Sequence, residues 1–448
     1  MKKPLPPKTS HPKRQPIMKR PASAGPTASA EAAIAKVTAA RLAAFEILTL
    51  VGEGKGYSDE LLHSPRIESL SPEDRNLTTA LVMGVLRWQI ALDARIRSLL
   101  QRPEQRLAEP VALALRLGAF QLLHLDRIPA HAALSESVEL CRAAGQPHAT
   151  GMVNAVLRKL AAAQKPGQRV FESVAAFSER LGHPQWLAER WVAAYGREAA
   201  LKICEADQKE PEEGALFTEN GGDLPHMDDG SRLVAELAAA SAPDAKAVWD
   251  CCASPGGKTL ILAHRLSLAE ITATDISAKR MAQTEARFRR YAYAERIRCA
   301  VADAIVPTGD QSYDLILCDV PCSGTGTLAG NPEIRHRLRP EEFPRQAARQ
   351  RAILNGALKR LAPGGKLVYS TCSLEPEECE KIVAEVIAGT DIVQIPVEAS
   401  MQQLFESGVL RQDADLTSAV RDGALRTLPG VHPCDGFFAI VLESQKQG

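Results

Sequence analysis

The chain has 448 residues, of which 45% are hydrophobic and 24% charged, so it is long enough for two or three folded domains. Its 54 basic residues balance its 54 acidic ones, and net charge therefore neither favours nor excludes a nucleic-acid partner. Ten cysteines without a Cys-x-x-Cys pair exclude a zinc site of the usual spacing and favour free thiols in a reducing compartment. No apolar run is long enough to cross a bilayer, so we expect a cytoplasmic protein without membrane contact or bound metal.

The first segment, residues 1–32, is rich in proline and in basic residues. Its first thirty residues contain seven prolines and no acid, a composition that predicts a disordered arm. The segment lacks the apolar stretch of a signal peptide. Such an arm could touch RNA phosphates through charge alone, although a solvated tail is the simpler interpretation.

Residues 33–165 carry apolar side chains at helical spacing, for example Leu77, Leu81 and Val85. Ser71-Pro72 is typical of a helix start, because serine caps free backbone amides and proline fits the first turn. We therefore predict a bundle of several helices over this segment.

Residues 166–232 form the expected link to the rest of the chain. Apolar and aromatic side chains around Trp186 and Trp191 predict one or two further helices. The polar stretch 207–229, which contains several glycines and prolines, predicts a loop-rich boundary.

From residue 233 onward, short apolar runs alternate with helical stretches. The expected strands are 247–252, 270–276, 297–302, 313–320, 366–372, 392–395 and 436–442. The expected helices begin near Gly257, Ser277, Pro344 and Pro376. This alternation predicts that 233–448 is an α/β domain with a mostly parallel sheet and helices on both faces. Ligands in such sheets bind beyond the carboxyl ends of the strands.

The first expected strand leads into a turn of small residues and then into a helix. The turn is Cys252-Ala253-Ser254-Pro255-Gly256-Gly257-Lys258. Small residues let a ligand approach the backbone closely, and the helix amides attract an anion. A P-loop would need glycine at Cys252, and the Gly-x-Gly-x-x-Gly fingerprint of dinucleotide sites is absent. S-adenosylmethionine is the remaining candidate, because its carboxylate could sit on this loop.

Two aspartates follow the next two expected strands. Asp275 ends the second strand, where a carboxylate could accept hydrogen bonds from both ribose hydroxyls. Asp303 ends the third strand and could hold the adenine amino group. Either residue could instead be a helix cap, but two at successive strand ends favour a nucleotide site.

Asp319 and Cys322 end the fourth expected strand, and Cys372 ends the fifth. Adjacent strands would place the three side chains around one pocket. A thiol suits methylation of cytosine C5, because a thiolate that adds to C6 makes C5 able to attack a methyl group. Asp319 could bind N3 and the amino group of the cytosine. Spacing alone does not decide which cysteine attacks. The remaining strand cysteines are interpreted as small hydrophobic side chains: Cys251, Cys299 and Cys318.

Four motifs between residue 228 and the C-terminus resemble, in order, those of the Nol/Nop/Sun RNA cytosine-C5 methyltransferases. They are Asp250-x-Cys252-Ala253-Ser254-Pro255-Gly256-Gly257-Lys258-Thr259, Asp319-x-Pro321-Cys322-Ser323-Gly324, Ser370-Thr371-Cys372-Ser373 and Asp435-Gly436-Phe437-Phe438. The helical segment 33–165 resembles the NusB-type RNA-binding domain that precedes the catalytic domain in the bacterial 16S rRNA methyltransferases of the Sun/Fmu branch.

The resemblance implies a Rossmann-like methyltransferase domain, S-adenosylmethionine as cofactor and 16S rRNA as partner. It implies that Cys372 attacks cytosine C6 and that Cys322 assists product release. It also implies that residues 252–258, Asp275, Asp303 and Asp319 line the cofactor and base site.

One region departs from the family pattern. The segment ahead of the cofactor loop, 213–231, is short and acidic where the family carries a longer RNA-recognition segment with an Arg-x-Asn signature. Four alternatives remain: a non-catalytic ribosome-assembly factor, a C5 methyltransferase of another RNA such as tRNA, a DNA cytosine methyltransferase that attacks through Cys322, and a methyltransferase of another substrate.

Overall fold

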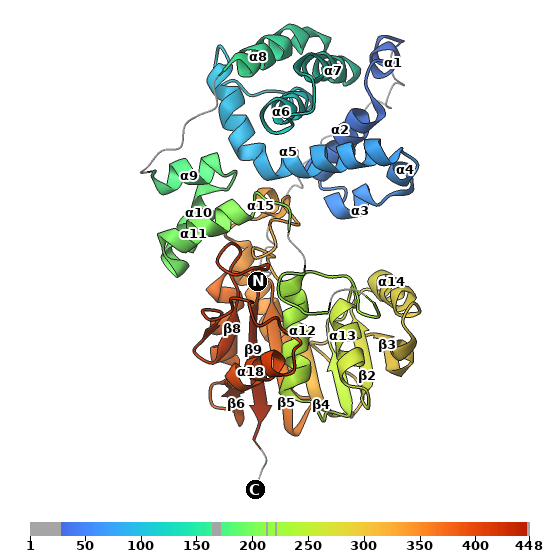
Figure 1. Ribbon diagram of the computed structural model, residues 1–448, viewed down its shortest axis with the longest axis vertical. Coiled ribbons are helices and arrows are strands. Elements are labelled where there is room, and N and C mark those ends of the chain that lie inside the picture. Colours follow the sequence, from blue (N-terminus) through green and yellow to red (C-terminus); the bar gives the residue numbers. More distant parts are fainter. Residues whose placement is uncertain (1–27, 164–171, 212–213, 220–221, 446–448) are drawn as a thin grey trace, which may run out of the picture.

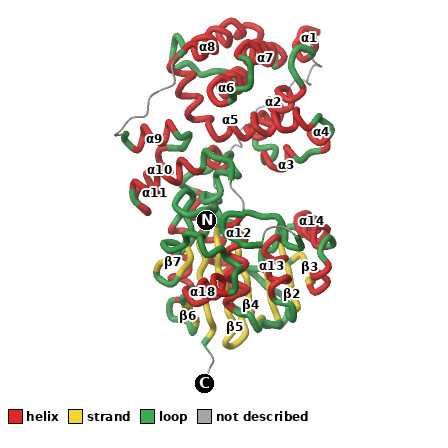
Figure 2. Tube along the Cα trace, viewed as in Figure 1, coloured by secondary structure: helices red, strands yellow, loops and turns green. Residues whose placement is uncertain are grey.

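The computed structural model describes residues 28–163, 172–211, 214–219 and 222–445. Helices alone build its N-terminal part, and the strands lie in the C-terminal part, as Figure 2 shows in red and yellow. Residues 1–27 of the predicted arm lie outside the described residues, and residues 28–32 begin helix α1 rather than continuing the arm. Within the described residues no helix is both long enough and apolar enough to span a membrane.

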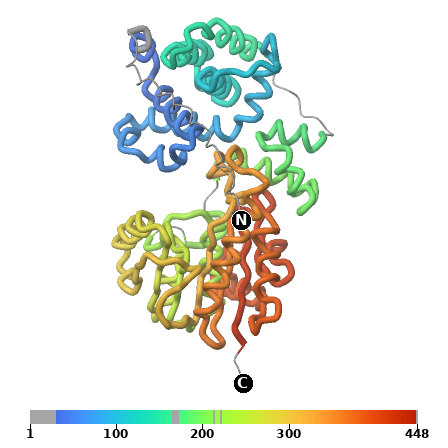
Figure 3. Tube along the Cα trace, turned by 180° about the vertical axis from the view of Figure 1, so that it is seen from behind, coloured from blue at the N-terminus to red at the C-terminus, as the bar shows by residue number. Residues whose placement is uncertain are grey.

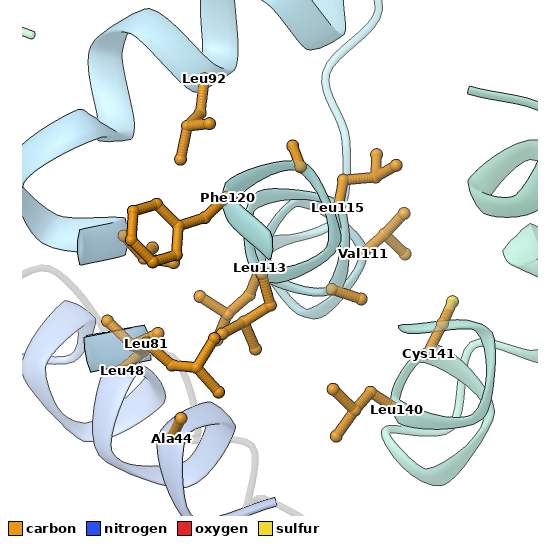
Figure 4. Close-up of a cluster of buried hydrophobic side chains, with 14 of the residues drawn as sticks. Ala44, Leu48, Leu81, Leu92, Val111, Leu113, Leu115, Phe120, Leu140 and Cys141 are labelled. Carbon is orange, nitrogen blue, oxygen red and sulfur yellow. The ribbon is translucent and has the colours of Figure 1, made fainter. Parts of the chain in front are cut away.

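The predicted helical bundle is present. Its helices are α1 (Ala28–Ile34), α2 (Ala39–Gly52), α3 (Ser58–Leu62), α4 (Pro65–Glu68), α5 (Pro72–Leu99), α6 (Glu109–His124), α7 (Ala130–Ala143) and α8 (Thr150–Ala162). The Ser71 side chain accepts a hydrogen bond from the Asp74 amide at 3.1 Å, so α5 begins where the sequence predicts. Leu81, Leu115 and Leu140 are buried in a core shared by α2, α5, α6 and α7 (Figure 4).

Three further helices follow: α9 (Val174–Arg180), α10 (Gln185–Tyr195) and α11 (Arg197–Ala206). They share a small core around Trp191, which is fully buried. The Trp191 indole N–H donates to Glu375 at 3.1 Å, so these helices pack directly on the α/β part of the chain. The predicted linker is therefore a packed layer rather than a tether.

The α/β part is built on one nine-stranded sheet with strand order β3-β2-β1-β4-β5-β9-β8-β7, with β6 pairing β9. The strands are β1 (Ala247–Asp250), β2 (Glu270–Asp275), β3 (Ile297–Val301), β4 (Tyr313–Asp319), β5 (Leu361–Thr371), β6 (Ile392–Ile395), β7 (Val420–Arg421), β8 (Ala424–Arg426) and β9 (Phe438–Ser444). The first five are parallel, and β9 runs antiparallel to β5. From β1 the sheet extends to one side through β2 and β3 and to the other through β4 and β5, so the strand order reverses between β1 and β4. Ligands bind at this point in such sheets.

Helices cover both faces of the sheet, as predicted (Figure 1). One face carries α12 (Asp229–Ser241), α13 (Gly257–Arg265) and α18 (Glu398–Glu406), and the other carries α16 (Glu342–Leu358) and α17 (Glu380–Ile387). Helix α14 (Ala278–Phe288) packs along β2 and β3. Helix α16 begins two residues before the predicted start, and the predicted start at Pro376 is a single 3-10 turn, Pro376–Glu378, ahead of α17. The fold class predicted from the sequence is confirmed.

A short segment around helix α15 (Ile334–Arg337), which lies between β4 and β5 in the sequence, packs against the helical part. Figures 1 and 3 show it between the helical part and the sheet. The Glu333 carboxylate accepts from the Ser58 amide at 2.9 Å, and the Arg337 guanidinium donates to the Gly56 carbonyl at 2.6 Å. Arg335 is buried among backbone carbonyls from several segments. These contacts fix the helical part over the sheet.

Candidate active site

The carboxyl ends of β4 and β5 bring together the two cysteines that the sequence singles out. Cys322 lies three residues after β4 and Cys372 lies one residue after β5. Their Sγ atoms are 3.2 Å apart, and both residues are half-buried. The two parallel strands are hydrogen-bonded neighbours with Asp319 opposite Ser370, which explains why loops 50 residues apart in sequence meet here.

Asp319 lies at the end of β4 beside both thiols, as predicted. Its Oδ1 accepts from the Ser370 hydroxyl at 2.8 Å, and its Oδ2 forms an ion pair with the Lys258 ammonium at 2.8 Å. Burial opposes the charge on Lys258, but the nearby acidic groups, Asp319 foremost and Asp228 after it, together outweigh burial and raise the pKa of Lys258. A charged Lys258 therefore lies behind Asp319, and it also faces Cys372 closely enough to interact with it electrostatically.

A cavity of about 300 Å³ opens beside the cysteines, beyond the ends of β1 to β4. Seven of the predicted site residues line it: Cys252, Ser254, Asp275, Asp303, Asp319, Cys322 and Cys372. Asp275 ends β2 and accepts from Arg280 at 2.8 Å, while Asp303 follows β3 and accepts from the Ile305 amide at 2.9 Å. No helix begins directly after Asp303, so the helix-cap role considered for it is wrong, and its carboxylate caps a turn at the edge of the cavity.

The other predicted cofactor residues form the turn beneath this cavity. Gly256 has a left-handed φ of 95° and ends the turn as the N-cap of α13, a conformation that glycine adopts at little cost. Ala253 is buried, and Gly257 is the first helical residue. Ala253, Pro255, Gly256, Gly257 and Lys258 do not line the cavity. Lys258 points instead toward Asp319 and the Ser231 hydroxyl, which it contacts at 2.6 Å.

Asp250, the first residue of the cofactor-loop motif, is fully buried at the end of β1. Its Oδ2 accepts a 2.6 Å hydrogen bond from the Thr259 hydroxyl, which ties the strand to α13. Burial raises the pKa of Asp250 to about 7, and the hydrogen bond from Thr259 only partly opposes this. The folded protein therefore keeps a proton on Asp250 at pH values where the unfolded chain has lost it.

We expect Asp250→Asn to flatten part of the pH dependence of stability. Between about pH 4 and pH 7 the folded state binds a proton that the unfolded state does not, so the free energy of unfolding falls as the pH rises. The loss is complete above pH 7 and is on the order of a few kcal/mol. Urea unfolding at pH 5 and pH 8 measures it. The wild type should lose more stability over this interval than the variant, and equal losses would contradict the expectation.

Three of the four sequence motifs meet at Gly326. Its amide donates to the Cys372 carbonyl at 2.9 Å, and its carbonyl accepts from the Gly436 amide at 2.8 Å. A Cβ atom at Gly326 would lie 2.1 Å from the Gly436 oxygen and 2.9 Å from the Cys372 oxygen. Only glycine allows the two cysteine loops and the Asp-Gly-Phe-Phe motif to approach this closely.

We therefore expect Gly326→Ala to cost about 1–3 kcal/mol of stability through overpacking, because the added methyl group must shift the Cys372 or Gly436 backbone. Gly330→Ala is the matched control, because the nearest atoms to its Cβ lie at 3.8 Å and 3.9 Å. Urea unfolding of both variants checks this. Equal behaviour of the two variants would show that the close approach at Gly326 does not matter.

The surroundings of Cys322 disfavour its thiolate form. The contact with Cys372 and burial both raise the pKa of Cys322 well above its ordinary value. Cys322 is thus held as a protonated thiol that can donate toward the Cys372 sulfur. Among the strand cysteines interpreted as hydrophobic, Cys251 and Cys318 are buried as expected, whereas Cys299 is half-exposed because β3 is an edge strand.

Some residues around the site are not indicated by the sequence motifs. Ile276, Arg280 and Arg349 line the cavity, and Ser231 contacts Lys258. Arg349 lies on α16, far from the motifs in sequence, and nothing in its neighbourhood points to a site. Ile276 directly follows Asp275. An apolar residue next to the acid that ends a strand is the one sequence signal that could have identified a residue of this set.

The sheet order, the cofactor loop and the strand-end carboxylates together define a Rossmann-like methyltransferase. Models of two families match the chain: 16S rRNA methyltransferase RsmB/F over residues 238–443, and the NusB family over residues 38–162. The chain is similar to the ribosomal RNA small subunit methyltransferase B of Xanthomonas campestris, with 33% identity over 92% of this chain and 99% of that protein. It is similar to the protein of that name from Erwinia tasmaniensis, with 32% identity over 90% and 98% of the two chains.

Among solved structures, the crystal structure of PH0851 has a TM-score of 0.65 and 21% identity, covering 90% of this chain and 97% of that one, which supports the fold. The chain belongs to the RsmB/F family of 16S rRNA methyltransferases. It is therefore an RNA methyltransferase that uses S-adenosylmethionine, and its helical part is a NusB domain. The resemblance seen in the sequence is confirmed.

Proposed function

We propose that the protein methylates C5 of a cytosine in 16S rRNA, with Cys372 as the nucleophile. The observation that carries this is the meeting of two thiols, 3.2 Å apart, beside Asp319 at the mouth of the cofactor cavity. A non-catalytic assembly factor would have no need of this arrangement. The relatives of this chain carry the name of small-subunit rRNA methyltransferases, which favours 16S rRNA over tRNA or DNA as the substrate.

The chemical character of the cavity fits S-adenosylmethionine. Asp275 presents a carboxylate at the strand end where ribose hydroxyls bind, and the half-exposed Ile276 beside it offers an apolar surface for adenine. The amino-terminal end of α13, after Gly256, lies in the turn where the methionine carboxylate would sit. When bound, S-adenosylmethionine supplies the electrophilic methyl group.

The residues of this chain would act on the cytosine in the following way. The Cys372 thiolate adds to C6, which breaks the C5–C6 double bond and makes C5 nucleophilic. Asp319 lies where it can hold the N3 and amino edge of the base, and the Lys258 ammonium keeps that carboxylate in place. After C5 has gained the methyl group, it loses its proton to a base and the Cys372–C6 bond breaks, which restores the double bond. Cys322, adjacent to Cys372, assists this release.

A covalent trap tests this function. Fluorine at cytosine C5 cannot leave as a proton does, so RNA transcribed with 5-fluorocytidine should accumulate a protein–RNA adduct in the presence of S-adenosylmethionine. The adduct should resist denaturing gel electrophoresis, and peptide mass spectrometry should place it on Cys372. Methyl transfer to unmodified RNA at a position other than cytosine C5, without any adduct, would overturn the proposal.

Bisulfite sequencing of rRNA and tRNA from a deletion strain identifies the substrate. One cytosine of 16S rRNA should lose its protection from bisulfite, and loss of protection at a tRNA position instead would reassign the RNA.

We propose that the NusB domain, residues 33–165, contacts this RNA, with residues 166–232 linking it to the catalytic domain, 233–448. The target cytosine must be unstacked to expose C6, so a rigid duplex should be a poor substrate.

A further inference from the structure

Behind the two cysteines lies a buried carboxylate that belongs to none of the four motifs. Glu378 ends the 3-10 turn Pro376–Glu378, between β5 and α17, and its side chain has no solvent exposure. A buried acid is costly unless its oxygens accept several hydrogen bonds. No ion pair to Glu378 occurs among the described residues. Its position is therefore maintained by neutral donors alone.

Those donors come from both cysteine loops. Ser323, the residue after Cys322, donates its amide to Glu378 Oε1 at 3.0 Å and its hydroxyl to Oε2. Ser373, the residue after Cys372, donates its hydroxyl to the same Oε2. The two serine hydroxyls are 3.0 Å apart. One carboxylate thus ties together the residues that immediately follow the two thiols.

Glu378 is itself held by the body of the domain. Gln350, on α16, donates to its Oε1 at 3.2 Å and to the Pro321 carbonyl at 3.0 Å. The Tyr369 hydroxyl, from β5, donates to the Glu378 carbonyl at 2.8 Å. The carboxylate is therefore a fixed point, supported by a helix and a central strand, from which both cysteine loops are positioned.

We propose that Glu378 is a positioning residue that sets the distance between the Cys322 and Cys372 sulfurs. This role rests on the function proposed above, in which one thiol attacks and the other assists release. The loops are 50 residues apart in sequence, and covalent catalysis tolerates little error in placing reacting groups. Glu378 never touches the substrate. It acts through Ser323 and Ser373.

Oxidative cross-linking measures the thiol geometry without any RNA. Diamide removes two electrons and two protons from a pair of adjacent thiols, forming a disulfide as its own N=N bond is reduced to a hydrazine. Peptide mass spectrometry follows the Cys322–Cys372 linkage over time. Because a displacement of about 1 Å costs about 100-fold in a positioned reaction, we expect Glu378→Gln to slow this linkage at least about tenfold. Adduct formation on 5-fluorocytidine RNA should slow by a similar factor, with binding of S-adenosylhomocysteine unchanged.

The controls separate positioning from folding and from the proposed function. Glu377→Gln changes the adjacent acid, which pairs with Arg190 at 2.8 Å, and should cross-link at the wild-type rate. If Glu378→Gln does not fold, Ser373→Ala removes one hydroxyl of the same tie and should still slow cross-linking several-fold. An unchanged cross-linking rate in the folded variant would overturn the positioning role. Wild-type cross-linking without any RNA adduct would overturn the proposed function alone.

Discussion

Cys372→Ala is expected to abolish methyl transfer and to remove the covalent adduct with 5-fluorocytidine RNA. The variant loses the thiolate that adds to C6, and no other group described near the cytosine site is placed to replace it except Cys322. The contact with Cys372 is lost in this variant, but burial still raises the pKa of Cys322, and a protonated thiol is a poor nucleophile. The expected loss in kcat is at least about 10³-fold, the scale seen when a covalent nucleophile is deleted.

Cys322→Ala is the matched variant, because it removes the neighbouring thiol and leaves Cys372 in place. It should form the adduct and lose turnover, since the release step is the one that Cys322 serves. Denaturing gels of both variants with unmodified and fluorinated RNA distinguish the two roles. An adduct that survives in Cys372→Ala and disappears in Cys322→Ala would reverse the assignment and favour the attack mode of DNA cytosine methyltransferases.

The strand ends were predictable from the sequence because parallel strands leave a local signal. Apolar runs followed by small or acidic residues mark where a strand stops, and the sheet then brings those ends to one edge. Asp275, Asp319 and Cys372 were found in this way, each within one residue of the strand end that the structure gives. Asp303 lies two residues beyond β3, so its distance from the strand was less well predicted.

The contacts behind the site were not predictable, because they join residues far apart in the sequence. Glu378 lies in a run of acids that looks like a solvated helix start. It is nevertheless fully buried, and it accepts a hydrogen bond from Ser323, 55 residues away in the sequence. Ser231 likewise meets Lys258 across 27 residues. Hydrophobic periodicity reports which face of an element is buried, and it carries no information on which polar groups will pair across elements.

The antiparallel edge of the sheet shows a second limit. Strands β7 and β8 have two and three residues, too short for a repeating pattern, and neither was predicted. The structure of the shortened segment ahead of the cofactor loop was likewise not predicted. Phe217 is fully buried and pairs with Leu410, although its acidic surroundings suggested only a polar boundary. The structure of such short segments is decided by tertiary packing rather than by the local sequence pattern.

Arg335→Met is expected to cause the largest loss of stability among single changes at the junction of the two domains. Arg335 is 1% exposed. Its guanidinium donates to backbone carbonyls of all three parts of the chain at 3.2–3.3 Å: Arg87 on α5, Gly182 and Asp207 in the linker, and Leu328 in the catalytic domain. Burial lowers the pKa of Arg335 to about 10, so the group remains charged near neutral pH. Methionine fills the space but removes the donor that these carbonyls share, at an expected cost of about 3–5 kcal/mol.

Arg345→Met is the control, because Arg345 is 72% exposed and pairs with Glu342 on the surface, so its loss should change stability by less than about 0.5 kcal/mol. Urea unfolding measures both variants. Limited proteolysis should cut the linker of Arg335→Met faster than that of the wild type, since the carbonyls of three segments lose their common donor. If the protein needs the NusB domain held over the catalytic pocket, the KM for RNA should rise while S-adenosylhomocysteine binding stays unchanged. Unfolding curves that coincide for the two variants would show that Arg335 does not hold this junction.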